Sequence, residues 1–82
     1  MKNLEFIEEF ALNYVEGLAK IYRKCSWDSI VTSERLTGFI RRNPDGVKKS
    51  FTTEFEKKFG YAPEESQVEY AEAVVLLAAI NY

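Results

Sequence analysis

The chain has 82 residues, of which 46% are hydrophobic and 15% aromatic, and its formal net charge is −2. This composition is that of one globular domain over residues 1–82, close to the lower size limit for a self-sufficient apolar core, and it excludes a disordered chain. Because histidine is absent and Cys25 is the single cysteine, the sequence also excludes His/Cys zinc sites, His-based catalysis and an intrachain disulfide.

Targeting and membrane segments are not expected. The N-terminal residues carry acidic side chains where a signal peptide needs an apolar run. The longest stretch without a polar side chain, residues 73–80, is far shorter than the roughly 20 residues that span a bilayer. We therefore expect a cytoplasmic protein that does not insert into the membrane.

The first predicted helix covers residues 4–24, with Asn3 as its N-cap. Apolar side chains at spacings of three and four form one stripe, made of Leu4, Ile7, Ala11, Tyr14, Leu18, Ile21 and Cys25. Further apolar residues widen this stripe, so the helix is predicted to be buried on two sides; they are Phe6, Phe10, Val15 and Tyr22. The pattern makes Cys25 a small buried residue.

A shorter helix is predicted from Ser29 or Ser33 to Arg42. Because Gly38 disfavours an uninterrupted helix, this helix is expected to be kinked or split. Its inward residues are Ile30, Leu36, Phe39 and Ile40. Residues 43–46, Asn-Pro-Asp-Gly, favour a turn because proline presets φ and the other three residues tolerate turn conformations.

The third predicted helix covers Val47 to Phe59, with an apolar residue at every fourth position and Gly60 as the C-cap. Pro63 is expected in the first turn of the last helix. The inner face of that helix is predicted to hold Val68, Ala71, Val75, Leu76 and Ala79. These patterns predict an all-α fold, a small bundle of about four helices.

The last helix is apolar around its whole circumference over residues 73–80. A surface helix would show a polar face, so this helix is either central to the bundle or covered by another chain. We favour the central position in the bundle, and a homodimer stays open because the helix is apolar all round. A monomer in solution would place Val74, Leu77 and Ala78 in the core of the chain itself.

Catalytic and cofactor chemistry is not expected. Glu65, Glu69 and Glu72 share one helical face, but such a row is more often a solvated surface than an acid–base or metal site. The glycines form no phosphate-binding loop. We therefore expect a protein that is not an enzyme, has no cofactor and no small-molecule substrate, and acts by binding another macromolecule.

Charge is unevenly distributed along the chain. Residues 34–58 hold seven basic and four acidic side chains, whereas residues 59–82 hold four acidic side chains and none that are basic. The basic middle is either a solvated face or a patch that meets an acidic protein segment, since a net negative charge opposes nucleic-acid binding. Trp27 either caps the core or anchors a contact. The predicted partner-binding residues are Trp27, Arg41, Arg42, Lys48 and Lys49.

The chain as a whole, from residues 1–10 (Met-Lys-Asn-Leu-Glu-Phe-Ile-Glu-Glu-Phe) to residues 76–82 (Leu-Leu-Ala-Ala-Ile-Asn-Tyr), resembles the cytoplasmic antiholins of T-even coliphages, their rapid-lysis accessory proteins. The resemblance implies a small phage protein that binds the cytoplasmic N-terminal segment of the membrane holin. Such binding delays host lysis, alongside a separate periplasmic antiholin. The resemblance brings no contact residues with it.

The alternative function is a small phage regulator that acts on host transcription through DNA or RNA polymerase. Salt dependence separates the two functions, because DNA binding weakens steeply with salt and a helix-in-groove contact does not.

Overall fold

The computed structural model describes residues 2–25 and 31–82. It contains four helices, α1 (Leu4–Cys25), α2 (Ser33–Arg42), α3 (Pro44–Phe59) and α4 (Glu65–Ile80). The described residues include no strand, so the predicted all-α bundle of about four helices is confirmed. Within these residues, no helix has both the length and the apolar character that crossing a membrane requires.

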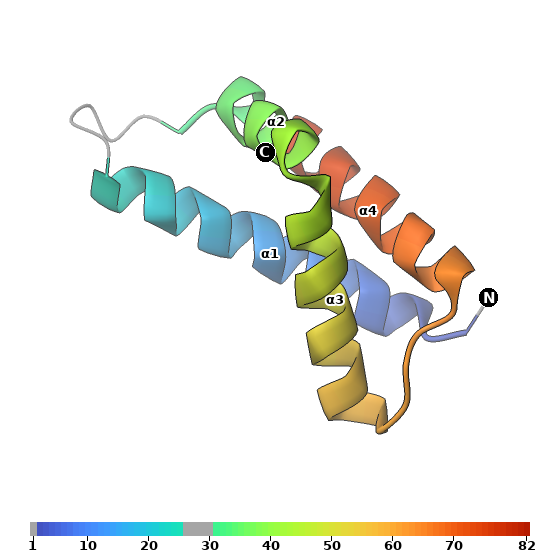
Figure 1. Cartoon of the computed structure of the whole chain (residues 1–82). Helices are drawn as coiled ribbons and strands as arrows, with labels where there is room; N and C mark the ends of the chain where they lie inside the picture. Colours follow the sequence, from blue (N-terminus) through green and yellow to red (C-terminus); the bar gives the residue numbers. More distant parts are fainter. Residues whose placement is uncertain (1, 26–30) are drawn as a thin grey trace.

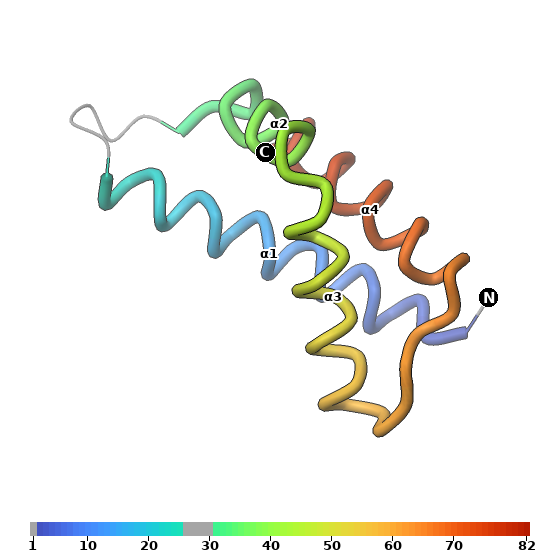
Figure 2. The backbone as a smooth tube through the Cα atoms, in the orientation of Figure 1, coloured from blue at the N-terminus to red at the C-terminus, as the bar shows by residue number. Residues whose placement is uncertain are grey.

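The helices are arranged around α4. Helices α1 and α4 lie side by side, α3 crosses them, and α2 lies at the C-terminal end of α4 (Figure 1). The N-terminal ends of α1 and α4 meet where Gln67 Nε2 donates to the Lys2 carbonyl over 3.0 Å. At the other end, the Arg23 guanidinium donates to the Tyr82 hydroxyl, so the two helices run in the same direction (Figure 2).

The core consists of apolar side chains from all four helices. Its centre is aromatic: Phe51 and Phe55 are fully buried, and Phe6 of α1 packs edge-on against Phe55 with ring centroids 5.8 Å apart. The remaining buried hydrophobic residues are Ile7, Phe10, Ala11, Val15, Leu18, Ala19, Leu36, Ile40, Val47, Ala71, Val75 and Ala79. The predicted spacing of four along α3 therefore does supply the core.

The predicted buried stripe of α1 is correct only in its middle. Ile7, Ala11 and Leu18 are buried, whereas Leu4 and Ile21 are 41% and 59% exposed. Cys25 is exposed as well, so its predicted burial is wrong. The reason is length: the 22 residues of α1 extend about 33 Å, whereas the 16 residues of α4 extend only about 24 Å. Because the N-terminal ends of the two helices meet, it is the C-terminal end of α1, with Ile21 and Cys25, that projects beyond α4.

The exposure of Cys25 has a direct chemical consequence. We expect its thiol to react with a water-soluble thiol reagent in the native protein at a rate within about tenfold of the rate in denaturant. Absorbance of the released thiolate measures both rates, and Cys25 is the single cysteine, so the signal has one source. Native protection of a hundredfold or more would contradict the exposed position.

Helix α2 is continuous through Gly38, so the expected kink or split is absent between Ser33 and Arg42. Its start matches the second of the two predicted positions. The Thr32 side chain caps it by accepting a hydrogen bond from the Arg35 amide over 3.2 Å. Ser29 and Ile30, the other predicted start and its inward residue, lie outside the described residues.

The predicted turn over residues 43–46 is wrong, because α3 already begins at Pro44. Asn43 alone separates α2 from α3, and its backbone amide bonds back to the Phe39 carbonyl over 3.1 Å. Proline suits the first position of a helix, where its missing N–H group has no intrahelical partner to lose. The same residues that favour a turn therefore start a helix, and α3 begins three residues earlier than predicted. At its other end Gly60 adopts φ 80°, as a C-cap glycine does.

Helix α4 begins at Glu65, so the expected place of Pro63 in its first turn is wrong. Glu64 is the N-cap, and its amide donates to Gln67 Oε1 over 2.9 Å in a capping box. Ala71, Val75 and Ala79 are fully buried as predicted. The predicted inner residues Val68 and Leu76 are half-buried, and Gln67 takes a buried position instead.

Candidate functional site

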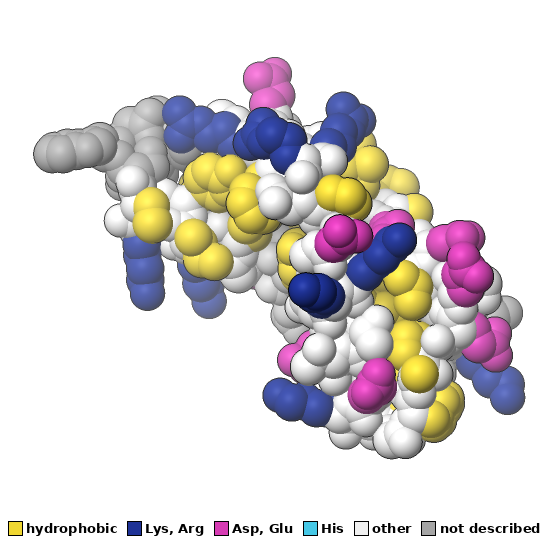
Figure 3. Space-filling view, viewed as in Figure 1, with side chains coloured by type: hydrophobic (Ala, Val, Ile, Leu, Met, Phe, Trp, Pro, Cys, Tyr) yellow, Lys and Arg dark blue, Asp and Glu magenta, His cyan; other side chains and the backbone are white. Residues whose placement is uncertain are grey.

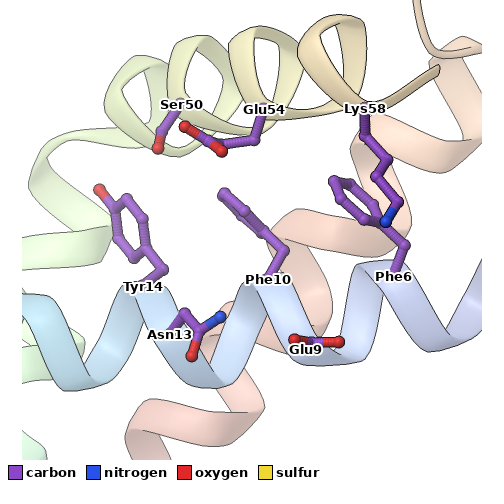
Figure 4. Close-up of a pocket in the computed structure, with 8 residues that line it drawn as sticks. All are labelled: Phe6, Glu9, Phe10, Asn13, Tyr14, Ser50, Glu54 and Lys58. Atoms are coloured by element: carbon purple, nitrogen blue, oxygen red, sulfur yellow. The ribbon is translucent and has the colours of Figure 1, made fainter.

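Tyr14 of α1 lines two hollows, one on each side of its ring. The first, between α1 and α3, has a volume of about 330 Å³. Figure 4 shows Phe6, Phe10 and Tyr14 projecting from α1 toward α3. Its remaining lining residues are polar or charged, namely Glu9, Asn13, Ser50, Glu54 and Lys58. Two carboxylates and one ammonium give this hollow no single charge preference, so it lacks the character of a selective site.

Tyr14 is held between the two hollows by its position on α1. Its ring packs against Phe10 with centroids 5.7 Å apart, and its hydroxyl lies 3.5 Å from the position that a Cβ on Gly46 would occupy. Burial raises the pKa of the Tyr14 hydroxyl above its ordinary value. The side chain therefore stays neutral at physiological pH and presents an uncharged wall to both hollows.

The second hollow is a groove between α1 and α2 with a volume of about 360 Å³. We call it the α1/α2 groove; it is lined by Asn13, Tyr14, Gly17, Leu18, Ile21 and Phe39. None of these six residues is charged. Phe39 is held in place by Tyr22, whose ring meets it edge-on at 6.1 Å between centroids. The groove exists because the C-terminal part of α1 extends past α4 while α2 contacts α1 only slightly.

Basic side chains stand along the edges of the α1/α2 groove. Lys24 follows Ile21 by three residues and Lys20 follows Gly17 by three, so both lie on the groove side of α1, and both are exposed. Arg42 follows Phe39 by three residues on α2 and is also exposed. Figure 3 shows hydrophobic side chains gathered over the α1 and α2 end of the molecule, with Lys and Arg side chains on both sides of them. The groove therefore combines an apolar floor with a cationic rim.

The structure separates the two predicted arginines. Arg42 follows the groove residue Phe39 by three positions on α2, and its Nη1 atom lies 3.4 Å from the position of a Cβ on Gly38. Arg41 instead lines a different hollow, together with Thr37 of α2 and Ile80 of α4. Adjacent helical residues project about 100° apart, which explains the separation. Of the two arginines, Arg42 has the helical position nearer to Phe39, and its guanidinium also approaches Gly38, which lines the hollow of Arg41.

The two predicted lysines, Lys48 and Lys49, lie on α3 and so do not join Arg42. Lys48 Nζ lies 3.8 Å from Glu72 Oε1 and so links α3 to α4. Lys49 is exposed on α3. Trp27 lies outside the described residues. The basic middle of the chain is therefore distributed over several surfaces and does not form one patch.

Sequence reasoning did not select Gly17, Lys20, Ile21, Lys24 or Phe39 as partner-binding residues. One signal was present in the sequence: the apolar stripe of the first helix continues to Ile21 among basic residues, which is typical of an amphipathic binding face. The periodicity alone does not distinguish such a face from core.

Comparison with known proteins adds no relative: no protein-family model matches the chain, and no curated protein or solved structure gives a significant match.

Proposed function

We propose that this protein binds a short amphipathic segment of another protein in the α1/α2 groove, and that the segment is the cytoplasmic N-terminal region of a phage holin. In this proposal the protein acts as a cytoplasmic antiholin, at the inner membrane of the host through its partner, and delays lysis. The observation that carries the proposal is the groove itself, which has an uncharged, largely apolar floor between basic edges. The antiholin resemblance of the sequence supplies the identity of the partner.

The apolar floor supplies most of the binding free energy in this proposal. Ile21 is 59% exposed and Phe39 is half-buried, so both retain surface that a partner helix can cover. Each buried Leu- or Ile-sized side chain contributes roughly 1.5–3 kcal/mol when it leaves water completely. An amphipathic helix presents such side chains at spacings of three and four, which suits a groove between two helices.

The basic edges select the orientation and the charge of the partner. Lys20, Lys24 and Arg42 favour a segment with acidic side chains beside its apolar face. Exposed ion pairs contribute little affinity each and are screened by salt. We therefore expect Arg42→Glu to slow association more than it speeds dissociation, and Arg41→Glu, on another side of α2, to leave both rates within about twofold.

The decisive experiment is a calorimetric titration of the protein with a soluble peptide of the holin's cytoplasmic N-terminus. We compare the wild type with Ile21→Glu, which places a carboxylate in the apolar groove, and with Leu12→Glu. Leu12 is a matched control because it is 61% exposed on α1 and is absent from the groove lining. Both positions are exposed, so both variants should fold. We expect Ile21→Glu to weaken binding by at least about tenfold and Leu12→Glu to leave it unchanged.

The titration includes a duplex DNA control over a range of salt concentrations. The proposal is contradicted if the wild type does not bind the peptide. It is also contradicted if Ile21→Glu and Leu12→Glu weaken peptide binding equally. Salt-sensitive binding to DNA without peptide binding would favour the transcriptional alternative.

A further inference from the structure

Helix α4 carries two apolar seams, and the protein's own core covers only one of them. The covered seam repeats at every fourth position, as Gln67, Ala71, Val75 and Ala79. The other seam repeats at spacings of three, four and three, as Tyr70, Ala73, Leu77 and Ile80. Leu77 and Ile80 are 58% and 52% exposed, Ala73 is exposed, and Tyr70 is half-buried. The outward seam has the spacing of a helix-pairing interface, and its larger side chains stay exposed among residues 2–25 and 31–82.

Opposite charges stand at the two ends of the outward seam. Glu69 is exposed beside Tyr70 at the N-terminal end. At the C-terminal end, Arg41 of α2 lines a hollow together with Ile80, and Glu34 of α2 lines the same hollow. Glu69 and Ile80 are eleven residues apart, close to three full turns, so they lie along the same edge of α4. The acidic and basic groups are thus on one side of the seam, about three turns apart.

We propose that the outward seam binds a second copy of this chain, with the two α4 helices antiparallel about a twofold axis. In this arrangement Ala73 of each copy faces Leu77 of the other, so small side chains meet large ones. Because the twofold axis keeps each edge on its own side, Glu69 of each copy also approaches Arg41 of the other, and the pair occurs twice. Parallel pairing would instead place the two Glu69 residues at one end of the contact and the two Arg41 residues at the other, so that the opposite charges would not meet. Charge complementarity therefore selects a second copy in the antiparallel orientation.

The contact is small, because the seam from Tyr70 to Ile80 spans roughly three helical turns. Interfaces of limited area are typical of weak, concentration-dependent association. We therefore expect monomer and dimer to exchange within the concentration range of ordinary solution experiments. This dimer is independent of the proposed partner groove, because none of its seam residues lines the α1/α2 groove.

Sedimentation equilibrium over a series of concentrations from micromolar to millimolar tests the dimer. We expect the wild-type mass to rise from the monomer value of 9.5 kDa toward twice that value. Leu77→Glu should remain monomeric throughout, whereas Leu12→Glu, at an equally exposed position on α1, should behave as the wild type. A wild type that stays monomeric at every concentration, or equal dissociation by both variants, overturns the inference.

A charge exchange tests the antiparallel orientation. Glu69→Arg and Arg41→Glu should each weaken the dimer by about tenfold, and the double variant should recover most of the loss because the attractive pair is restored with reversed sign. Failure of the double variant to recover, or a tighter dimer in Glu69→Arg alone, overturns the antiparallel pairing. Far-UV circular dichroism of each variant verifies the fold. Leu77→Glu should retain peptide binding, so the dimer and the holin proposal fail separately.

Discussion

Replacement of Phe55 by alanine is expected to lower the free energy of unfolding by about 3–5 kcal/mol. The Phe55 ring is fully buried and meets four other rings, those of Phe6, Phe51, Phe59 and Tyr61, at centroid distances of 4.6–5.8 Å. Truncation to alanine removes the free energy gained by transferring the Phe55 ring from water to the core. It also leaves a cavity that the neighbouring aromatic rings of α1 and α3 cannot fill without losing their own contacts. No smaller side chain restores those contacts.

Urea denaturation followed by far-UV circular dichroism measures the loss. A domain of this size has a stability of only about 5–15 kcal/mol, so the variant should show a much lower midpoint. Leu12→Ala is the control, because Leu12 is 61% exposed and should cost no more than about 0.5 kcal/mol. A cost for Phe55→Ala in that same small range would show that the aromatic cluster is not the core.

Helix periodicity predicted the elements and the centre of the core, because the residues that recur every three or four positions lie against one another. Phe51 and Val75 are fully buried as their spacing predicts. The same rule failed for Ile21 and Cys25, which are exposed at the end of α1. Periodicity identifies a face but not how far along the helix a partner covers it. That extent depends on the relative lengths and crossing of helices far apart in the sequence.

Local sequence also left the start of α3 ambiguous. Pro44 is suited to the second position of a turn and equally to the first position of a helix. The fold favours the helix, because with α3 beginning at Pro44 the side chain of Val47 is only 1% exposed in the core. Tertiary packing decides between two locally acceptable conformations in this case.

The candidate groove could be predicted only in part. The apolar and basic residues of its α1 side are adjacent in sequence, but Phe39 comes from another helix, and nothing in the sequence shows that α1 and α2 leave space between them. Arg41 and Arg42 are predicted from the sequence to share one basic patch, whereas in the structure they project from different sides of α2. Arg41 lines a hollow together with Ile80, near the outward seam of α4, and Arg42 follows the groove residue Phe39 by three positions on α2. One basic segment therefore serves two different surfaces.

Helix α4 shows a related limit of the sequence pattern. Because the sequence of the last helix is apolar around its whole circumference, it could not distinguish burial within the bundle from contact with another chain. The structure contains both environments on one helix: Val75 is fully buried, whereas Leu77, two residues later, is 58% exposed. Val74 and Ala78 are half-buried, so within this chain Leu77 is the exposed member of the three residues whose burial the pattern left open.

A larger side chain at position 17, in the floor of the α1/α2 groove, is expected to increase the stability of the protein and to weaken its binding of the holin peptide. Gly17 lies in the middle of α1, lines the groove, and has no atom within 4 Å of the position that a Cβ would occupy. Glycine inside a helix costs roughly 0.5–1 kcal/mol relative to alanine because it loses more backbone entropy on folding. Gly17→Ala and Gly17→Leu should therefore both stabilise the protein by a gain of that order.

The two variants should differ in binding, because they differ in how much of the groove they occupy. The alanine methyl group is small, so Gly17→Ala should bind the holin peptide within about threefold of the wild type. The leucine side chain extends into the space between Ile21 and Phe39, so Gly17→Leu should weaken binding by at least about tenfold. Thermal unfolding and calorimetric titration of the same samples measure both effects. Retained binding in Gly17→Leu would show that the partner lies elsewhere, and lost binding in both variants would show that α1 must approach its partner through the glycine backbone itself.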